Sequence, residues 1–413
     1  MSDPGTGRLT GEPAARPATI VRLANFVGPR SGGLRTALQE LGRGYLAAGH
    51  HPVLVTPGPR FGDEETPHGR VITLPGPIVP WMGGYRVVLG RRRLTALLDE
   101  LRPDRLEVSD RTTLRWTGTW ARRRDVPSIM VSHENVTALL TMALPRWAPA
   151  RRIADGLNQR TAGRYDQIVA TTEFAAAEFR RLGATGLVKV PLGVDLERFT
   201  PALHDPALRA ELARPGELLL VHCGRLSPEK RVDRSVDALA ALRARGVPAV
   251  LVVVGDGPRR PALERRARGL PVQFLGFVPD RVHVARLLAT ADAVLAPGPA
   301  ETFGLAALEA MACGTPVVAA GDGALGEVIG DAGVAVAGNQ GVRFAEAVLE
   351  LAARPEADRR AAARRRAQRY DWPSAVNGML AAHGLDPFRT FEEVASWPRA
   401  TVRASASRRS VIR

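Results

Sequence analysis

The chain has 413 residues, of which 45% are hydrophobic, and its formal net charge is +15. A chain of this length can bury a large core and is expected to form two domains. No apolar run reaches the roughly 18 residues of a membrane-spanning helix, and the first residues lack the apolar core of a signal peptide, so we expect a cytoplasmic protein. The only cysteines, Cys223 and Cys313, lie in apolar patterns, which excludes a disulfide framework and a readable zinc site.

Strand and helix patterns alternate through the first half of the sequence. An apolar strand pattern at 18–26 is followed by a glycine-containing loop at 27–33, a helical pattern at 34–49 and a second strand pattern at 51–58. This βαβ order predicts a parallel sheet covered by helices. Three further strands of the same sheet are predicted at 105–110, 128–133 and 167–172.

The second half repeats this order more clearly. Helical patterns such as that at 232–246 separate six short apolar runs, at 217–224, 249–257, 272–277, 291–298, 316–322 and 333–338. We therefore predict an α/β fold with two doubly wound, Rossmann-like domains.

Composition predicts the domain boundaries. Residues 195–216 are polar, contain prolines and have weak periodicity, so we interpret them as the linker between a first domain at 18–194 and a second domain at 217–370. A further helix is predicted at 371–384 and could cross back toward the first domain. The terminal segments, which we expect to be disordered, are residues 1–17 and the basic tail at 385–413.

Two cations follow the first predicted strand of the second domain. Arg225 and Lys230 lie five residues apart in the loop after Cys223, at the strand end where open parallel sheets bind ligands. A planar guanidinium and a mobile ammonium at this place would suit a diphosphate. A solvated loop with ordinary surface charges would show the same spacing. Lysine occurs only at positions 189 and 230, however, and this rarity favours a function for Lys230.

Two glutamates flank the start of a later predicted helix. Glu301 lies in the loop after the strand pattern at 291–298, and Glu309 lies inside the helical pattern that follows. A helix N-terminus attracts anions, and the backbone N–H groups at this one belong to Phe303, Gly304 and Leu305. An anion site with a carboxylate on each side would suit a sugar nucleotide. The alternative is that Glu301 caps the helix and Glu309 is an exposed helix residue.

Four motifs occur in order between residues 224 and 309, namely GRLSPEK, VVVGDGP, LGFVPD and ETFGLAALE. Together they resemble the nucleotide-sugar domain of retaining family-4 glycosyltransferases, which have the GT-B fold of two Rossmann-like domains facing a cleft. The similarity extends from about residue 18 to about residue 384. The first domain is similar to that of bacterial phosphatidylinositol mannoside mannosyltransferases.

The resemblance assigns donor-side roles to residues of the second domain. In such enzymes the positions of Arg225 and Lys230 bind the donor diphosphate, and the position of Glu301 binds the transferred sugar. The resemblance likewise places the donor ribose on Glu309 and the base on the backbone near Val278.

On the acceptor side, Gly32 and Gly33 resemble the glycine loop of the family, and Gly33 is also expected to contact the donor. His133 corresponds to a histidine near the transferred sugar. Without the resemblance, two glycines would indicate a simple turn and a lone histidine a structural residue. The family usually has glycine after the lysine, whereas this chain has Arg231, which affects the expected local geometry of the loop.

The predicted reaction moves a hexose, mannose from GDP-mannose by the resemblance, onto a glycolipid headgroup such as a phosphatidylinositol mannoside. Positive charge from Arg225 and Lys230 would stabilise the departing diphosphate. Because no Asp-x-Asp motif occurs, we expect no metal and no other cofactor. Nucleic acid is not expected as a partner.

Several other functions are weighed against this one. A different sugar nucleotide with another acceptor fits the same motifs. A hydrolase would use two carboxylates but not the two cations, and an NAD enzyme would need G-x-G-x-x-G in its first turn. A pyridoxal phosphate enzyme would need a Schiff-base lysine, for which only Lys189 and Lys230 exist. A non-catalytic basic protein that binds anionic lipid or nucleic acid remains the alternative outside enzymes.

A lipid acceptor implies peripheral docking on an anionic membrane surface, expected at the inner face of the plasma membrane. The arginine triplets Arg91–Arg93 and Arg122–Arg124 could supply the charge. Tryptophans that could enter the lipid interface are Trp81, Trp116 and Trp120. Solvated helix faces in an arginine-rich chain are the alternative explanation for the triplets.

Overall fold

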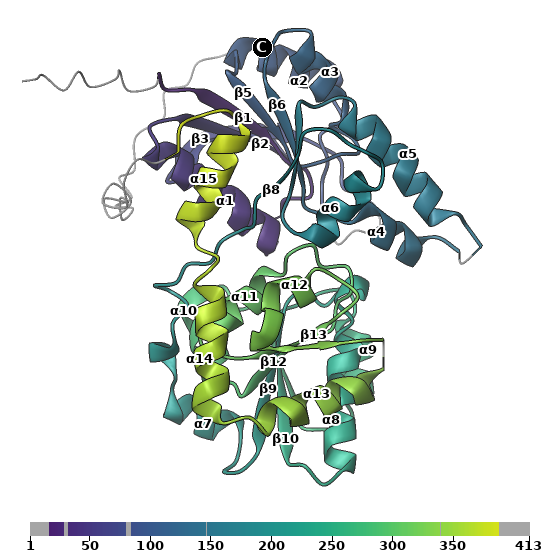
Figure 1. Ribbon diagram of the computed structural model, residues 1–413, viewed down its shortest axis with the longest axis vertical. Helices are drawn as coiled ribbons and strands as arrows, with labels where there is room; N and C mark the ends of the chain where they lie inside the picture. Colours follow the sequence, from purple (N-terminus) through teal and green to yellow (C-terminus); the bar gives the residue numbers. More distant parts are fainter. Residues whose placement is uncertain (1–15, 29–31, 80–83, 146, 339, 388–413) are drawn as a thin grey trace, which may run out of the picture.

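The computed structural model describes residues 16–28, 32–79, 84–145, 147–338 and 340–387. Two β-sheets, each covered by helices, form two domains that are stacked one above the other in Figure 1. Most of the two terminal segments that were expected to be disordered, and Trp81, lie outside the described residues.

The first sheet has eight strands in the order β3-β4-β2-β1-β5-β6-β7-β8. Its strands are β1 (Thr19–Leu23), β2 (His51–Gly58), β3 (Gly62–Thr66), β4 (Gly69–Pro75), β5 (Arg105–Val108), β6 (Ser128–Ser132), β7 (Gln167–Ala170) and β8 (Leu187–Lys189). Neighbouring strands pair in parallel except β3 and β4, which form an antiparallel edge hairpin. Strands β3, β4 and β8 were not predicted, because β3 is polar and β8 has only three residues.

The second sheet has six strands in the order β11-β10-β9-β12-β13-β14, all parallel. They are β9 (Leu218–Cys223), β10 (Ala249–Val254), β11 (Val272–Gly276), β12 (Ala293–Ala296), β13 (Val317–Ala320) and β14 (Val334–Val336), and each falls in a predicted apolar run. The strand order reverses between β9 and β12, as it does between β1 and β5 in the first sheet. Such a reversal is the switch point at which doubly wound sheets bind ligands.

Helices connect the strands and cover both sheets. Those of the first domain are α1 (Gly33–Ala47), α2 (Arg91–Leu101), α3 (Trp116–Arg122), α4 (Val136–Ala143), α5 (Ala150–Ala162) and α6 (Glu173–Arg180). Those after β8 are α7 (Pro206–Leu212), α8 (Val232–Ala244), α9 (Arg260–Arg266), α10 (Arg281–Thr290), α11 (Leu305–Ala312), α12 (Leu325–Ile329), α13 (Gly341–Ala352), α14 (Glu356–Ala367) and α15 (Trp372–Ala382). The two doubly wound domains are those that the alternating patterns predicted.

The segment predicted as a linker, 195–216, contains regular structure. It forms the short 3₁₀ helix η1 (Pro201–Leu203) and then α7, whose N-terminus is capped by the side chain of Asp205 and has proline in its first turn. Phe199 and Leu208 are buried, so the segment packs against the second domain instead of forming a loose connection. Its few apolar side chains were too widely spaced to predict this.

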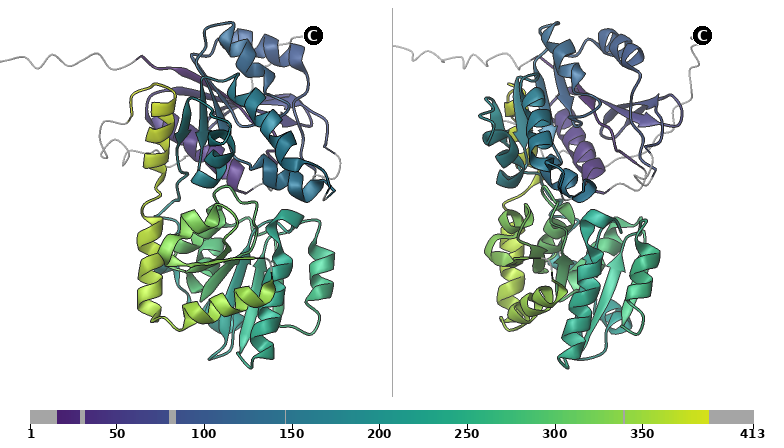
Figure 2. Two further views of the ribbon diagram at one scale, coloured as in Figure 1. Left: turned by 45° about the vertical axis from the view of Figure 1, so that its right-hand side comes forward. Right: turned by 90° about the vertical axis from the view of Figure 1, so that its right-hand side faces the viewer.

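Helix α15 packs on the first domain although it ends the described chain. Figure 2 shows α14 beside the second domain and α15, in line with it, beside the first. The two segments that connect the domains run side by side, and the backbones of Val194 and Asp371 form a parallel β-bridge between them. A Cβ atom on Gly44 of α1 would lie 2.2 Å from Val376, so glycine is required for the close approach of α1 and α15.

A buried ionic cluster fixes the end of α15 to the first sheet. Glu107 on β5 accepts hydrogen bonds from Arg22 at 2.9 Å and from the hydroxyl of Tyr45 at 2.8 Å, and it lies 3.4 Å from His383. Burial alone would raise the pKa of Glu107, but Arg22 and His383 lower it to about 2. The carboxylate is therefore ionised, and it joins α15 to strands far away in the sequence.

Candidate active site

The carboxyl ends of the two sheets face each other, and the predicted site residues lie there. The loop after β9 carries Arg225 and Lys230, and the loop after β12 carries Glu301. Strands β9 and β12 are neighbours at the switch point of the second sheet, so the topology brings together loops that are about 70 residues apart. His133 follows β6 of the first sheet.

Lys230 and Glu301 form an ion pair. Lys230 ends the 3₁₀ helix η2 (Pro228–Lys230), and its ammonium donates to the Glu301 carboxylate. Burial lowers the pKa of Lys230, but the charge of Glu301 more than offsets this effect, so the pKa is raised above its ordinary value. The lysine is therefore cationic at neutral pH and is held at the end of β9.

Arg225 reaches across to the first domain. Its guanidinium lies over the ring of Tyr85, 4.8 Å from the ring centroid. Tyr85 in turn packs edge-on against Phe26, which follows β1. A cation–π contact leaves the N–H donors at the edge of the guanidinium free to bind an anion, so stacking and diphosphate binding are compatible.

Glu309 is buried inside α11, with only 6% of its surface exposed. Its carboxylate pairs with Arg281, the first residue of α10, whose guanidinium lies 5.1 Å from the ring centroid of Phe199. Burial raises the pKa of Glu309, although Arg281 opposes the effect. The finding excludes the alternative in which Glu309 was an exposed helix residue.

Gly304 precedes α11 and has a positive φ of +85°, in the left-handed region that favours glycine. A Cβ atom on it would lie 2.2 Å from the side chain of Leu325 on α12. The backbone conformation and the packing against Leu325 therefore require glycine at this position, independently of any ligand. The neighbouring Phe303 side chain packs on Tyr370 in the interior, so only its backbone faces the site.

The N-termini of α1 and α11 face each other across the two domains. A Cβ atom on Gly33 would lie 3.6 Å from the side chain of Leu305. Gly32 is the N-cap of α1, and a Cβ atom there would meet nothing within 4 Å. The structure thus brings the predicted glycine loop to the predicted donor helix. Val278, the residue expected near the base, is half-buried at the loop between β11 and α10.

His133 lies at the end of β6, directly opposite the Glu301 loop. One ring nitrogen, Nε2, lies 3.2 Å from the hydroxyl of Ser109. Burial lowers the pKa of His133 to about 4, so the imidazole is neutral at physiological pH. Its backbone carbonyl oxygen accepts a 2.6 Å hydrogen bond from the hydroxyl of Thr302, the residue next to Glu301.

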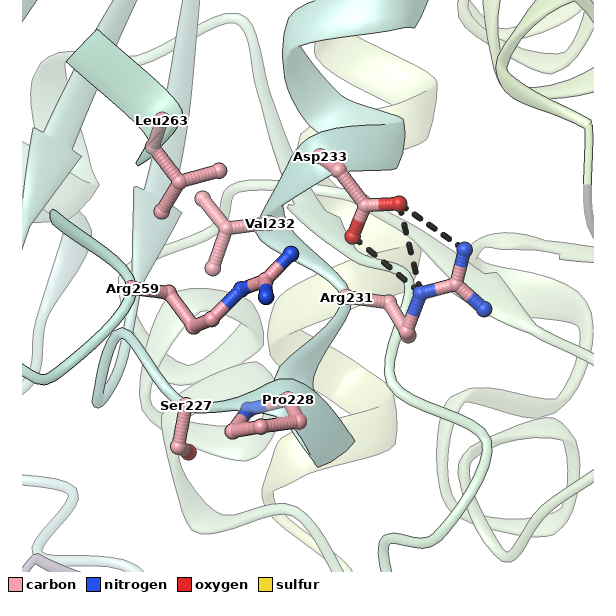
Figure 3. A pocket seen from close by; sticks show the side chains of 7 residues that line it. All are labelled: Ser227, Pro228, Arg231, Val232, Asp233, Arg259 and Leu263. Carbon is pink, nitrogen blue, oxygen red and sulfur yellow. Dashed lines mark hydrogen bonds and ion pairs between the residues drawn. The ribbon is translucent and has the colours of Figure 1, made fainter. Parts of the chain in front are cut away.

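A cavity of about 260 Å³ lies beside the Lys230 loop. Figure 3 shows the guanidinium of Arg259 extending toward Val232. The guanidinium of Arg231 instead turns to the carboxylate of Asp233, and the two groups are 2.8 Å apart. Arg231 has φ +49°, a left-handed conformation at the position where the family usually has glycine. Arg231 therefore adopts a backbone conformation that glycine takes without strain and that a residue with a Cβ atom adopts at a cost.

Two of the three predicted membrane-docking tryptophans, Trp116 and Trp120, are not available as expected. Trp120 is buried, donates to Asp99 and is covered by Arg124, whose guanidinium lies 4.8 Å from its ring centroid. Arg91 covers Trp116 in the same manner, at 5.7 Å. Neither ring is free to enter a lipid interface, because Arg91 and Asp99 reach them from α2 and Arg124, four residues after Trp120, covers that ring.

Among the described residues, no cluster of three or more His, Cys, Asp or Glu side chains could hold a metal ion. Both cysteines are free thiols. None of the described helices combines the length and apolar character that a bilayer crossing requires.

Sequence reasoning missed Tyr85, Thr302 and Arg281. Thr302 lies between two predicted residues, but nothing in its type indicated that its hydroxyl would reach His133. Its carbonyl oxygen also accepts hydrogen bonds from the hydroxyls of Thr171 at 3.1 Å and Thr172 at 2.9 Å. Arg281 follows the LGFVPD motif directly, so its position was a signal that could have been used.

Two Rossmann-like domains with facing strand ends, joined by a second crossing at α15, define the GT-B class of glycosyltransferases. Comparisons support this class. Residues 217–354 match the family model "Glycosyl transferases group 1", and residues 31–198 match "Glycosyltransferase Family 4". The crystal structure of HepE from Anabaena with UDP and glucose has a TM-score of 0.69 at 19% identity, covering 89% of this chain and 99% of that one.

A curated relative is much closer in sequence. The chain is 52% identical to the GDP-mannose-dependent α-(1-6)-phosphatidylinositol dimannoside mannosyltransferase of Mycobacterium tuberculosis, covering 88% of this chain and 96% of the relative. It is 35% identical to the D-inositol 3-phosphate glycosyltransferase of Actinosynnema mirum, over 67% and 71% of the two chains. The protein belongs to glycosyltransferase family 4, as its motifs predicted.

Proposed function

We propose that the protein transfers mannose from GDP-mannose to a hydroxyl group of a phosphatidylinositol mannoside, with retention of the anomeric configuration. The 52% identity to an enzyme of that name supports the donor and the acceptor. The arrangement of Arg225, Lys230 and Glu301 at the switch point, opposite His133, supports the chemistry.

In the proposed reaction the bond between the anomeric carbon and the diphosphate oxygen breaks, and its electron pair remains on GDP. Arg225, Lys230 and the backbone N–H groups at the start of α11 stabilise this charge electrostatically. The acceptor oxygen forms the new bond, and its proton passes to the departing diphosphate. No metal ion is required in this proposal, because the two side-chain cations fill that role.

Each remaining side chain has a role in the proposal. Lys230 exchanges its partner Glu301 for the diphosphate, which frees the carboxylate to accept hydrogen bonds from the hydroxyls of mannose. Glu309 receives the ribose, and the backbone near Val278 contacts the base. His133 is neutral and contacts the mannose from the first-domain side, where Gly32 and Gly33 border the acceptor.

The acceptor also implies a location. The enzyme would work in the cytoplasm, bound peripherally to the inner face of the plasma membrane through an anionic surface. The net charge of +15 favours that contact.

Mannosyl transfer can be tested directly. Purified full-length protein is incubated with GDP-mannose and phosphatidylinositol mannosides in detergent micelles, and the lipids are analysed by mass spectrometry. We expect a product one hexose heavier, whose new linkage is α by NMR, and no product from UDP-glucose. Consumption of UDP-glucose but not of GDP-mannose would refute the assignment of GDP-mannose as the donor. Release of free mannose without a lipid product would refute transfer to the lipid.

A second arm concerns the metal. The reaction is repeated with EDTA, and we expect the same rate. A rate that falls with EDTA and recovers with added Mg²⁺ would refute the metal-free mechanism while leaving mannosyl transfer intact.

A further inference from the structure

The hairpin between α4 and α5 exposes a tryptophan that the sequence analysis did not single out. Trp147 has 85% of its surface exposed, the largest fraction among the exposed large hydrophobic side chains of the described residues. Ile153, on the first turns of α5, is 42% exposed. Indole side chains concentrate where an apolar medium meets water, and an exposed indole that lies within a larger apolar surface marks an interaction site.

An apolar cavity of about 460 Å³ lies beside Trp147 in the same hairpin. It is lined by six residues with small or apolar side chains and by two arginines: Thr141, Leu144, Pro145, Ala148, Pro149, Ala150, Arg151 and Arg152. The cavity and the exposed indole therefore form one surface, which we call the hairpin tip: this lining together with Trp147 and Ile153.

Positive charge surrounds this apolar surface. Arg151 and Arg152 are both exposed, and no acidic partner is assigned to either in the part of the chain that the structure describes. They lie in the first turn of α5, which contains no acidic residue. Cations at that end oppose the helix dipole, so the two arginines do not serve the stability of the helix. An anionic partner would offset the unfavourable interaction of both arginines with the helix dipole.

The hairpin tip is joined to the candidate active site by one helix. Helix α4 begins three residues after His133 and has eight residues, which at 1.5 Å per residue corresponds to about 12 Å. Figure 1 shows the hairpin of α4 and α5 projecting from the side of the first domain, next to the face toward the second. A surface bound at the tip would thus be separated from His133 by little more than the length of this one short helix.

We propose that the hairpin tip docks into the headgroup region of an anionic phospholipid leaflet, with the indole of Trp147 at the lipid interface and Arg151 and Arg152 on lipid phosphates. The inference rests on the proposed function in one respect, that the acceptor is a membrane lipid. Apolar surface, unpaired cations and proximity to His133 together match a lipid leaflet, whereas a soluble polyanion would not require the apolar part.

The arginine triplets are the competing surface. At Arg91–Arg93 and Arg122–Arg124 the nearby indoles of Trp116 and Trp120 are covered by arginines, and Arg124 already pairs with Asp99. Among the described residues beside the triplets, Leu89 is 56% exposed, less than the 85% of Trp147, so these faces offer charge with less apolar surface that could insert. We therefore assign them at most a supporting attraction to the leaflet.

Vesicle sedimentation of the full-length protein tests the proposal. Vesicles of phosphatidylcholine mixed with phosphatidylinositol are compared with pure phosphatidylcholine at low salt. We expect Trp147→Ser to weaken binding to the anionic vesicles about tenfold. Arg151→Ser with Arg152→Ser should weaken it about 25-fold, or about fivefold for each arginine near the surface. Quenching of indole fluorescence by brominated lipid should disappear in Trp147→Ser.

Matched variants elsewhere on the first domain serve as controls. Phe61, which is 64% exposed at the turn before β3, is changed to serine, and Arg92 and Arg93 are changed together to serine. The Phe61 control should bind vesicles like the original chain, and the Arg92 and Arg93 control should weaken binding far less than the Arg151 and Arg152 variant does. Melting temperature and affinity for GDP should be unchanged in every variant, which shows that the chain is folded.

Three results would overturn the inference: Trp147→Ser binds and is quenched as before, the Arg92 and Arg93 double variant loses binding instead, or neutral vesicles bind equally well. Failure of the proposed function has a different signature. In that case the original chain forms no mannolipid in detergent, whatever its affinity for vesicles.

Discussion

The hydroxyl of Thr302 donates a 2.6 Å hydrogen bond to the carbonyl oxygen of His133, joining the loop after β12 in the second domain to a strand end of the first. Because Thr302 is next to Glu301, this bond sets the position of the proposed sugar-binding carboxylate relative to His133. The two domains are therefore connected at the site itself, and not only through the segments that cross between them.

Thr302→Val keeps the shape of the side chain and removes the hydroxyl that donates the hydrogen bond to His133. A lost hydrogen bond in a part-buried place costs about 1 kcal/mol, so we expect a modest loss of stability. Turnover should fall by about tenfold through misalignment of Glu301 with His133, whereas GDP affinity should be unchanged because Lys230 and Arg225 remain. Steady-state kinetics and calorimetry with GDP separate the two effects. An unchanged kcat would show that the bond is structural only.

Lys230→Ala and Arg225→Ala should each weaken GDP binding and slow transfer by at least about tenfold, because each leaves diphosphate charge unbalanced. Calorimetry with GDP is the measurement. Tyr85→Leu is the control for Arg225, since it removes the stacked ring but keeps the guanidinium. Unchanged GDP affinity in both alanine variants would remove the diphosphate site from these residues.

Glu301→Gln and Glu309→Gln should affect different kinetic quantities. The first should reduce kcat with little effect on GDP affinity, since its carboxylate is assigned to the transferred mannose. The second should weaken GDP itself, through the ribose, and should also destabilise the fold because Arg281 loses its buried partner. Equal effects of both variants on GDP affinity would contradict the assignment.

Arg231 offers a test of backbone strain. Its φ of +49° is unfavourable for any residue with a Cβ atom, by about 1–2 kcal/mol. Arg231→Gly and Arg231→Ala both remove the ion pair with Asp233, so the difference between them isolates the backbone. We expect the glycine variant to be more stable than the alanine variant by about 1 kcal/mol in urea unfolding. The reverse order would mean that the left-handed conformation is not retained.

Acid should destabilise the protein through His222. Burial, with a further effect from Lys230, lowers the pKa of His222 to about 4. The unfolded chain takes up this proton near pH 6.5 and the folded chain near pH 4, so stability is lost as the pH falls between these values, by about 1.4 kcal/mol per pH unit. His222→Asn should therefore show a shallower dependence of unfolding free energy on pH between 6 and about 4.5. An identical pH dependence in the variant and the original chain would contradict the lowered pKa of His222.

Local patterns in the sequence determined the two α/β domains and most of the predicted site. The residues concerned follow strands and precede helices, so the strand–loop–helix order alone placed Arg225, Lys230 and Glu301 at the ends of β9 and β12. The same strand–loop–helix order correctly predicted that Glu309 lies inside a helix. Short-range order was sufficient because parallel sheets align the carboxyl ends of their strands at one edge.

Only the tertiary structure decided which side chains meet and which remain exposed. His133 and Thr302 are 169 residues apart, and His383 at the end of α15 lies beside Glu107 of β5, 276 residues earlier in the chain. The two tryptophans Trp120 and Trp147 are the clearest case: each is followed by alanine and, within five residues, by at least two arginines, yet one is buried and the other is 85% exposed. Burial depends on side chains that arrive from other elements, such as Asp99 of α2 on Trp120, and no periodicity along a single segment contains that information.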